Sequence, residues 1–438
     1  MALETTSQRA ASGAGTIDAL RAQRCPTSAQ LYERARRVVP SGVTHDSRYH
    51  VPFPLYVSHA HGSRKWDVDG NEYVDYRMGH GALLLGHNHP AITRAIVEQA
   101  QKGTHYGACH ELEVRWAELV EEIVPCAQSV KFFSSGTEAT MMAMRLARAY
   151  TGRTKIIKIQ GGFHGWHDYA TVAMQPPYDV PLSKGVPAAV AGTVLAAPPR
   201  DAGAIERLLD QEPDVAAVIL IADGAGTAYL QRVRDVTRER GVVLIFDEVV
   251  TGFRYAPGGC QEYYGVTPDL ATLAKILAGG LPGACIAGRK DILALFDLRL
   301  DDPEWSRFGR IHHPGTFNAN PLSAAAGVAC LEIVRNPAVQ LQATATAQLL
   351  RRGLLDVLRR RGVEGDATGE VSIINLSFRR AGGGPTFSHR LRSAMQLYGV
   401  DFSGSLIVSA VHDERDVAHT VDAFDRALGL LQEEGLLP

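Results

Sequence analysis

Short apolar runs alternate with amphipathic stretches through the middle of the chain, from about residue 130 to residue 290. Continuous apolar runs between turn signals are typical of buried strands, whereas apolar residues at three- and four-residue spacing are typical of helices. The predicted strands are VKFF, TKIIKI, VAAVILI, VVLIFDEV and GACIAG. Helices are predicted between them, for example over 138–150 and 204–209. This alternation predicts an α/β fold whose mostly parallel sheet is flanked by helices.

The segments on either side show other patterns. Residues 55–76 alternate between apolar and polar positions around Asp69-Gly70, which predicts a hairpin or meander. After about Pro321 the chain is mainly helical, with short strands near 372–378 and 401–409. The N- and C-terminal segments are therefore expected to form a smaller α/β lobe beside the large domain.

These patterns give explicit domain boundaries. We expect a mobile tail over 1–23, because its first residues, MALETTSQRAASGAG, are small and polar. The other predicted parts are an N-terminal segment of the small lobe over 24–95, a large α/β domain over 96–320 and a C-terminal small domain over 321–438.

The composition excludes several classes of function. The chain has 438 residues, of which 45% are hydrophobic, so it can bury a large core. A net charge of −2 provides no broad basic surface for nucleic acid or an anionic membrane. No apolar run is long enough to span a bilayer, and neither a signal peptide nor a CxxC pair is present. We therefore expect a cytoplasmic protein whose partners are small molecules.

Ligands of parallel α/β sheets bind beyond the carboxyl ends of the strands, and three predicted strand ends carry unusual residues. The first strand, VKFF, leads into Ser134-Ser135-Gly136-Thr137 at the start of a helix. Backbone N–H groups and the helix dipole at such a position favour a phosphate group. Plain helix capping by serine is the alternative interpretation.

The second and third strand ends carry charged residues in apolar surroundings. Asp247 ends a nearly all-apolar strand, where it needs a cationic partner such as a protonated ring nitrogen or Arg254. Lys275 lies among Leu273, Ala274, Ile276 and Leu277. Desolvation lowers the pKa of such a lysine and makes its amine a nucleophile or Schiff-base former. A lysine that extends out of a helix end is the alternative.

Together these three features match the requirements of pyridoxal 5′-phosphate (PLP). Its phosphate needs N–H donors, its pyridine nitrogen needs a carboxylate, and its aldehyde needs an amine. His164 and His167 could also suggest a metal pair, but no further ligands stand at recognisable spacing, so no metal is expected.

The chain resembles the class III PLP-dependent aminotransferases of fold type I. The resemblance covers about Val38 to Ala326, and the stretches that carry it are WDVDGNEYVDY, GHNHP, SSGTEA, GGFHGWHD, IFDEVVTGFR, LAKILAGGLPGA and GTFNANP. Within the family it is most similar to the branch that contains glutamate-1-semialdehyde 2,1-aminomutase and D-phenylglycine aminotransferase.

The resemblance implies roles for individual residues around the cofactor. Lys275 would form the Schiff base and move the proton, and Asp247 would keep the pyridine nitrogen protonated. Phe163 would stack on one ring face and Val249 would pack on the other. The phosphate would be bound by Ser135, Gly136 and Thr137.

Further roles implied by the resemblance concern the partner subunit and the substrate. Thr316 would reach the phosphate of the neighbouring subunit, which implies a homodimer with a shared active site. Arg48 would bind the substrate carboxylate through its fork of donors. His80 is placed near the substrate, where the aminomutase carries tryptophan.

The chain departs from the family pattern at two places. Ile221-Ala222 stand where family members usually carry Glu-Pro, and the loop that follows is shorter. The C-terminal stretch DFSGSLIVSAVHDE contains no obvious equivalent of the gating glutamate of the aminomutase. Because an aminomutase must retain its intermediate between two half-reactions, a missing gate favours ordinary transamination.

The sequence therefore predicts a PLP-dependent transaminase that moves an amino group between an amino acid and a keto acid. An aryl side chain and a D configuration are both compatible with the resemblance. The alternatives are a glutamate-1-semialdehyde-type aminomutase, another PLP reaction such as a racemase or ammonia-lyase, and a non-catalytic PLP-fold binding protein. Neither the donor, the acceptor nor the choice between dimer and tetramer follows from the sequence.

Overall fold

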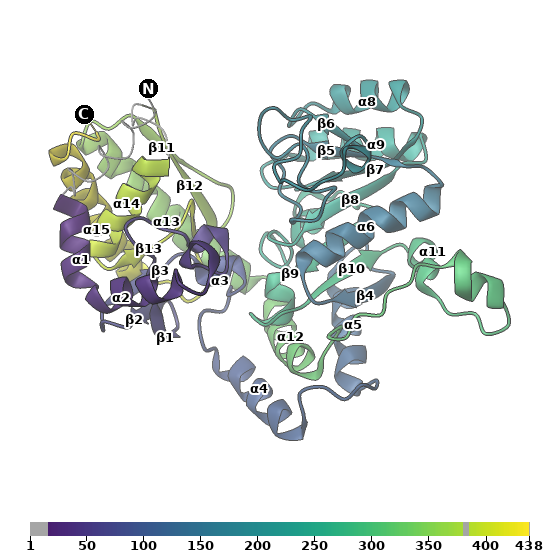
Figure 1. Cartoon of the computed structure of the whole chain (residues 1–438), viewed down its shortest axis with the longest axis horizontal. Helices are drawn as coiled ribbons and strands as arrows, with labels where there is room; N and C mark the ends of the chain where they lie inside the picture. The colour runs from purple at the N-terminus through teal and green to yellow at the C-terminus, as the bar shows by residue number, and fades with distance from the viewer. Residues whose placement is uncertain (1–15, 380–384, 438) are drawn as a thin grey trace. The chain divides into compact units, whose positions relative to one another are not determined.

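The computed structural model describes residues 16–379 and 385–437, and the chain divides into two compact units. Among the described residues, the first unit contains 16–79, 84–89, 341–379 and 385–437, and the second contains 80–83 and 90–340. Figure 1 shows the helices and strands of both.

The second unit is built around a seven-stranded sheet in the order β4-β10-β9-β8-β7-β5-β6. Neighbouring strands pair in parallel except β10, which is antiparallel to both β4 and β9. The strands are β4 (Ser129–Phe133), β5 (Lys155–Ile159), β6 (Val194–Ala197), β7 (Val215–Leu220), β8 (Val243–Glu248), β9 (Leu270–Ala274) and β10 (Ala284–Gly288). The predicted α/β fold with a mostly parallel sheet is confirmed.

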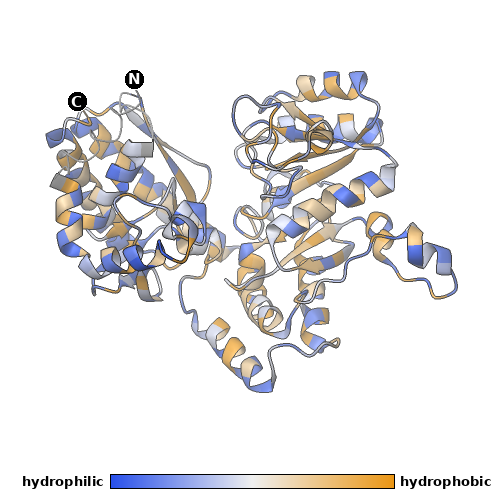
Figure 2. Cartoon of the chain, viewed as in Figure 1, coloured by the Kyte–Doolittle hydropathy of each residue, from blue (hydrophilic) through white to orange (hydrophobic). Residues whose placement is uncertain are grey.

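The burial of the central strands explains why the sequence pattern predicts them. Every residue of β7, β8, β9 and β10 is buried, so these strands read as continuous apolar runs. They are drawn mainly in hydrophobic colours in Figure 2. One strand was not predicted: β6 is short and only partly buried, which weakens its strand signal.

Helices of the second unit cover the sheet and its edges. α6 packs across β9, β10 and β7, and α12 packs against α4 and α5. The helices of this unit are α4 (Pro90–Lys102), α5 (Glu111–Ile123), α6 (Gly136–Thr151), α7 (Ala188–Ala191), α8 (Ala202–Gln211), α9 (Thr227–Glu239), α10 (Gly259–Tyr264), α11 (Lys290–Leu293) and α12 (Pro321–Val334). Short helical turns are η3 (Lys275–Ala278), η4 (Ala294–Phe296) and η5 (Trp305–Gly309).

The first unit combines two small sheets with helices from both ends of the chain. One sheet has the order β1-β2-β3-β13 and the other β11-β12-β14. The strands are β1 (Val57–His61), β2 (Arg64–Asp67), β3 (Glu72–Asp75), β11 (Gly365–Thr368), β12 (Ile373–Phe378), β13 (Val400–Asp401) and β14 (Ser405–Ile407). The helices and turns are α1 (Thr16–Arg24), α2 (Pro26–Ala35), η1 (Pro40–Gly42), η2 (Asp46–Arg48), α13 (Ala338–Arg360), α14 (Pro385–Leu397) and α15 (Glu414–Glu433).

The structure moves three of the predicted boundaries. Residues 16–24 form helix α1, in which Ile17 is fully buried, so the predicted tail is too long; its remainder, 1–15, lies outside the described residues. The first segment of the small unit gives way to the large unit near residue 90 rather than 95, because α4 packs on α12. For the same reason α12 belongs to the large unit, which ends at Gln340 rather than residue 320.

No single helix among the described residues is long and apolar enough to cross a membrane. One bent pair, α12 followed by α13, passes that test by length and composition, and α12 is largely buried inside the protein.

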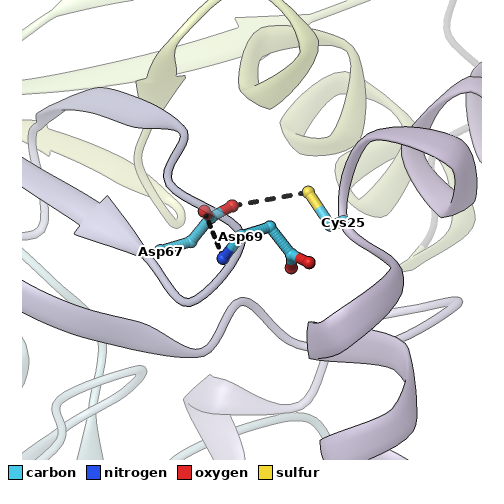
Figure 3. Close-up of side chains that lie close together, drawn as sticks. All are labelled: Cys25, Asp67 and Asp69. Atoms are coloured by element: carbon cyan, nitrogen blue, oxygen red, sulfur yellow. Dashed lines mark hydrogen bonds between the residues drawn. The ribbon is translucent and has the colours of Figure 1, made fainter.

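Hydrogen bonds tie helix α2 to the turn between β2 and β3. The Asp69 carboxylate accepts from the backbone N–H groups of Thr27 and Ser28 at 2.8 and 3.1 Å, so it caps the first turn of α2. The Cys25 thiol donates to Asp67 (Figure 3). Asp67 also accepts from the Tyr73 hydroxyl at 2.8 Å. Burial raises the pKa of the Cys25 thiol to about 11, so the thiol stays protonated as a donor.

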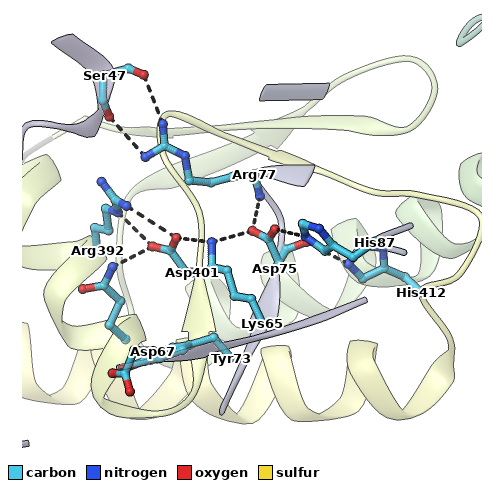
Figure 4. Close-up of polar contacts among 11 residues, drawn as sticks. Ser47, Lys65, Asp67, Tyr73, Asp75, Arg77, His87, Arg392, Asp401 and His412 are labelled. Atoms are coloured by element: carbon cyan, nitrogen blue, oxygen red, sulfur yellow. Dashed lines mark hydrogen bonds and ion pairs between the residues drawn. The ribbon is translucent and has the colours of Figure 1, made fainter. Parts of the chain in front are cut away.

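A buried ion network joins the sequence-distant strands β3 and β13. Lys65 Nζ donates to Asp75 Oδ1 at 2.7 Å and to Asp401 Oδ2 at 2.6 Å (Figure 4). Burial disfavours the ionised form of both carboxyl groups and so raises their pKa. At Asp75 the charge of Lys65 and the hydrogen bond from His87 outweigh burial and lower the pKa to about 2. At Asp401 the ion pairs with Arg392 and Lys65 likewise hold the pKa well below its usual range. The network therefore stabilises the fold at neutral pH and weakens as pH falls from about 4 towards 2.

Replacing Lys65 with methionine tests this network. Lys65→Met leaves two buried carboxylates with less positive charge, so we expect a loss of about 3–5 kcal/mol in the free energy of unfolding. Urea-induced unfolding at pH 7 measures it. Lys290→Met, which removes an exposed lysine, is the control and should change little. Equal stabilities of the two variants would show that the network contributes nothing.

Candidate functional site

The carboxyl ends of β8 and β9 bring two of the predicted catalytic residues to one edge of the sheet. The strands pair in parallel with Asp247 opposite Thr272, and Lys275 follows the last residue of β9 directly. Lys275 has a φ of 54°, a left-handed conformation that lysine rarely adopts. A strained backbone is therefore used to place this side chain at the strand end, and Lys275 does not lie at the end of an α-helix.

The Asp247 carboxylate is 3% exposed and is held by three donors. His164 Nδ1 lies 2.7 Å from Oδ2, and Oδ1 accepts from Thr272 Oγ1 at 3.2 Å and from the backbone N–H of Val249 at 3.1 Å. Arg254 Nη2 donates to the carbonyl of Gly81 at 2.7 Å, and the alternative that Arg254 is an ion partner of Asp247 stays a prediction.

The environment of Lys275 favours a neutral amine. Burial lowers the pKa of Lys275, the Asp247 carboxylate opposes this effect, and Arg254 adds to it. A lowered pKa increases the fraction of unprotonated amine at neutral pH, which is the form that attacks an aldehyde. The sequence signal for this lysine, its apolar neighbours, therefore corresponds to real desolvation.

The start of α6 combines capping with a phosphate-type cradle. Ser135 is the N-cap and accepts from the Glu138 N–H at 3.3 Å, while Glu138 accepts from the N–H groups of Ser134 and Ser135 at 2.8 and 2.9 Å. The capping alternative is thus correct for the Ser135 side chain. The N–H groups of Gly136 and Thr137 belong to the first helical turn, where no intrahelical acceptor exists, and they are the ones suited to an anion.

Two glycines allow the close packing around this helix start. A Cβ on Gly136 would lie 3.0 Å from both Cγ atoms of Val249. A Cβ on Gly165, whose φ is 100°, would lie 2.9 Å from the Cα of Thr137. Side chains at these positions would fill the space between α6, the end of β8 and the loop that carries His164.

These groups line one cavity of about 150 Å³. Phe163 on its rim is 58% exposed, and Val249 lies at the end of β8. Ile221 also lines the cavity, at the position where the family pattern has glutamate. The lining residues are Gly136, Thr137, Thr140, Phe163, His164, Gly165, Ile221, Asp247, Val249, Val250 and Lys275.

The chemistry of these groups fits PLP. Backbone donors at the α6 start suit its phosphate, the Asp247 carboxylate suits a protonated ring nitrogen, and the Lys275 amine suits its aldehyde. A side chain at Gly136 or Gly165 would meet Val249 or Thr137, so glycine at these positions keeps the start of α6 accessible to a phosphate group. The residues present therefore fit the cofactor.

Sequence reasoning missed three residues that support this cavity. His164 and Thr272 hold Asp247, and buried Lys158 donates to the carbonyls of Ala170 and Val172 in the loop that follows β5. The signal for His164 was present, since it stands in a glycine-rich turn after a buried strand, but its partner was not readable from the sequence. Lys158 gave no signal, because its bonds go to backbone atoms.

The remaining predicted residues, Thr316, His80 and Arg48, are not among the residues that line this cavity. Thr316 is exposed, and its carbonyl accepts from His105 Nε2 at 2.6 Å. His80 is half-buried in the short helix α3 (Met78–Gly81) and has a positive φ of 58°. Arg48 belongs to the first unit, whereas the cofactor residues belong to the second. The roles of these three residues stay predictions.

Known proteins similar to this chain belong to one family of PLP-dependent enzymes. The family model for aminotransferase class-III matches residues 45–379. A glutamate-1-semialdehyde 2,1-aminomutase from Methanocella arvoryzae is 42% identical over 364 residues, which cover 80% of this chain and 83% of that protein.

Solved structures agree with the family match. An omega-transaminase from Sphaerobacter thermophilus is 36% identical with a TM-score of 0.86, covering 92% of this chain and 98% of that one. A β-phenylalanine aminotransferase from Variovorax paradoxus is 29% identical with a TM-score of 0.83, covering 97% and 99%. With its carboxylate, lysine and helix-start cradle on one cavity, the chain belongs to the class III aminotransferase family and uses pyridoxal phosphate as its cofactor.

Proposed function

We propose that this enzyme is a transaminase that moves the amino group of an amino acid to a keto acid. The observation that carries the proposal is the state of the C-terminal stretch in which the aminomutase has its gating glutamate. Asp401 is 1% exposed and bound to Lys65 and Arg392, and Asp413 caps helix α15. Asp401 and Asp413 thus have structural roles, and Glu414, the one glutamate of this stretch, is an exposed residue of the first turn of α15, where its charge favours the helix N-terminus. We take this to favour a site without a gate that retains an intermediate.

A glutamate-1-semialdehyde-type aminomutase is the second candidate. The observation in its favour is the 42% identity to a protein with that name, which is higher than the identity to either solved transaminase. The two activities differ in one requirement. A transaminase needs a keto acceptor to complete its cycle, whereas an aminomutase returns the amino group to the same carbon skeleton.

The chain's own residues would share the chemical work as follows. Bound PLP supplies an aldehyde that takes up amino groups and a protonated ring that accepts electrons. Asp247, fixed by His164 and Thr272, would hold the proton on the ring nitrogen. The Lys275 amine would hold the cofactor and would carry the proton that leaves the amine-bearing carbon of the substrate. Phe163 and Val249 would orient the ring between them.

The substrate proposal concerns its carboxylate and its side chain. Arg48 would bind the carboxylate, because its planar guanidinium can donate two parallel hydrogen bonds. Ile221 provides an apolar wall where a glutamate would provide a charge. An α-amino acid with an aryl side chain suits this wall, and the name of the β-phenylalanine aminotransferase supports an aryl substrate.

The first prediction concerns Lys275. Borohydride treatment of the holoenzyme should attach the cofactor covalently to the peptide that contains residue 275, as measured by mass spectrometry. Lys275→Ala should lose this adduct and at least roughly 10²–10⁴-fold in turnover, because it lacks the proton-transferring amine. Lys158→Met is an informative control, since it removes another buried lysine and should leave the adduct in place. Full turnover in Lys275→Ala would contradict the proposal.

The second prediction concerns His164. His164→Ala removes a hydrogen bond to a buried carboxylate, so kcat should fall about 10- to 100-fold and the cofactor should dissociate more readily. His164→Asn retains a donor and should recover part of the loss. Absorbance spectra and cofactor-release rates measure the effect. His167→Ala, which removes a neighbouring ring without contact to Asp247, should have a smaller effect.

The third prediction separates the two candidate activities. A panel of amino donors, with and without keto acids, should show product only when an acceptor is present, and chiral analysis should identify the configuration of the donor. Glutamate 1-semialdehyde serves as the test substrate for the aminomutase. Its isomerisation without any acceptor, at a rate above that of every transamination, would replace the main proposal by the alternative.

A further inference from the structure

We propose that Arg77 is a positioning residue for Arg48. This inference rests on the proposed function of Arg48 as the residue that binds the substrate carboxylate. Arg77 Nη1 donates to the carbonyl oxygen of Ser47 at 3.1 Å, and Nη2 donates to the Ser47 hydroxyl at 3.1 Å (Figure 4). The guanidinium therefore holds the residue directly before Arg48 at two points, one of which is main chain.

The segment that carries Arg48 has little burial of its own. Residues 44–49 are all exposed, and η2 (Asp46–Arg48) is a single short turn. Its local bonds run from Ser47 N–H to His45 Nδ1 at 3.1 Å and from the Arg48 N–H to the His45 carbonyl at 2.8 Å. Exposed turns with few buried contacts open readily. An anchor from a rigid element is therefore needed if Arg48 is to keep one position.

Arg77 provides such an anchor because it is joined to the buried ion network. Its backbone N–H donates to Asp75 Oδ1 at 2.9 Å, and the same oxygen accepts from Lys65 Nζ. The other oxygen of Asp75 lies 2.7 Å from His87 Nε2. Asp75 is also the last residue of β3, which pairs with β13. Figure 4 shows these groups as one continuous set of contacts that ends at Ser47.

Arg48 itself is suited to an incoming anion. Its Nη1 donates to the neutral Thr44 hydroxyl at 2.8 Å, and within the described part of the chain it forms no ion pair with a carboxylate. Its charge is therefore not neutralised by a neighbour. A planar fork discriminates between carboxylates only while its orientation is fixed. The Arg77–Ser47 contact would fix it, so Arg77 acts on carboxylate affinity through Arg48.

A direct test of positioning is hydrogen–deuterium exchange on the PLP-loaded protein. Arg77→Met should increase exchange in the peptide that covers 43–50, while peptides of the seven-stranded sheet stay unchanged. Arg426→Met is the matched control, because it removes an arginine from the same unit that stacks on Tyr398 instead. Unchanged exchange over 43–50 in Arg77→Met would overturn the inference, whether or not the enzyme transaminates.

The functional test compares two donors that differ in the carboxylate alone, phenylglycine and benzylamine. Arg77→Met should raise KM for phenylglycine about tenfold and leave kcat and the KM for benzylamine nearly unchanged. Arg77→Lys retains the charge without the two-point fork and should restore only part of the affinity. A variant that merely destabilised the fold would affect both donors equally, and that result would contradict the inference.

A double-mutant cycle separates this inference from the proposed function. Arg48→Met should raise KM for phenylglycine, and adding Arg77→Met should then have no further effect. Additive effects would show that Arg77 acts independently of Arg48 and would overturn the inference. If Arg48→Met leaves KM unchanged, the proposed role of Arg48 fails and the inference fails with it. If Arg48→Met raises KM but Arg77→Met does not, the inference alone fails.

Discussion

The cofactor site depends on one buried carboxylate. Asp247 ends the apolar strand β8, where an ionised group is costly unless donors surround it. Its contacts with His164 and Thr272 meet this requirement and simultaneously fix the loop after β5 and the neighbouring strand β9. Because Lys275 follows β9 directly, the same contacts define where the reactive amine lies relative to the carboxylate. The cavity that both residues line therefore presents a carboxylate and an amine in fixed positions.

The first unit also buries charged groups, and it stabilises them by pairing carboxylates with a lysine and an arginine. Lys65 lies between Asp75 and Asp401, which come from opposite ends of the chain, and Arg392 completes the neutralisation. Such a network specifies which strands meet, because any other pairing would leave a buried charge without a partner. It also gives the exposed segment around Arg48 a rigid neighbour. Under the inference above, the stabilising network would also support substrate affinity, because the Arg77 backbone N–H donates to Asp75.

Similarity to known proteins shows the family of this enzyme but does not distinguish a transaminase from an aminomutase. The relative named above and the solved structures share the family chemistry, which Lys275 and Asp247 carry. The difference between the two activities concerns how long an intermediate is retained, and that depends on a few side chains around the substrate. Ile221, which lines the cavity, and the carboxylates of the C-terminal stretch are the positions at which the sequence predicts a departure from the family pattern.

The sequence by itself determined the α/β class, the positions of most large-domain strands along the chain and the residues that end them, because buried parallel strands leave continuous apolar runs and charged residues stand out against them. It also pointed to Lys275 through its apolar neighbours. It could not identify His164 as a partner of Asp247, nor assign α12 to the large unit. Tertiary structure decided these, since both depend on contacts between segments far apart in the chain, and local patterns carry no information on such pairs.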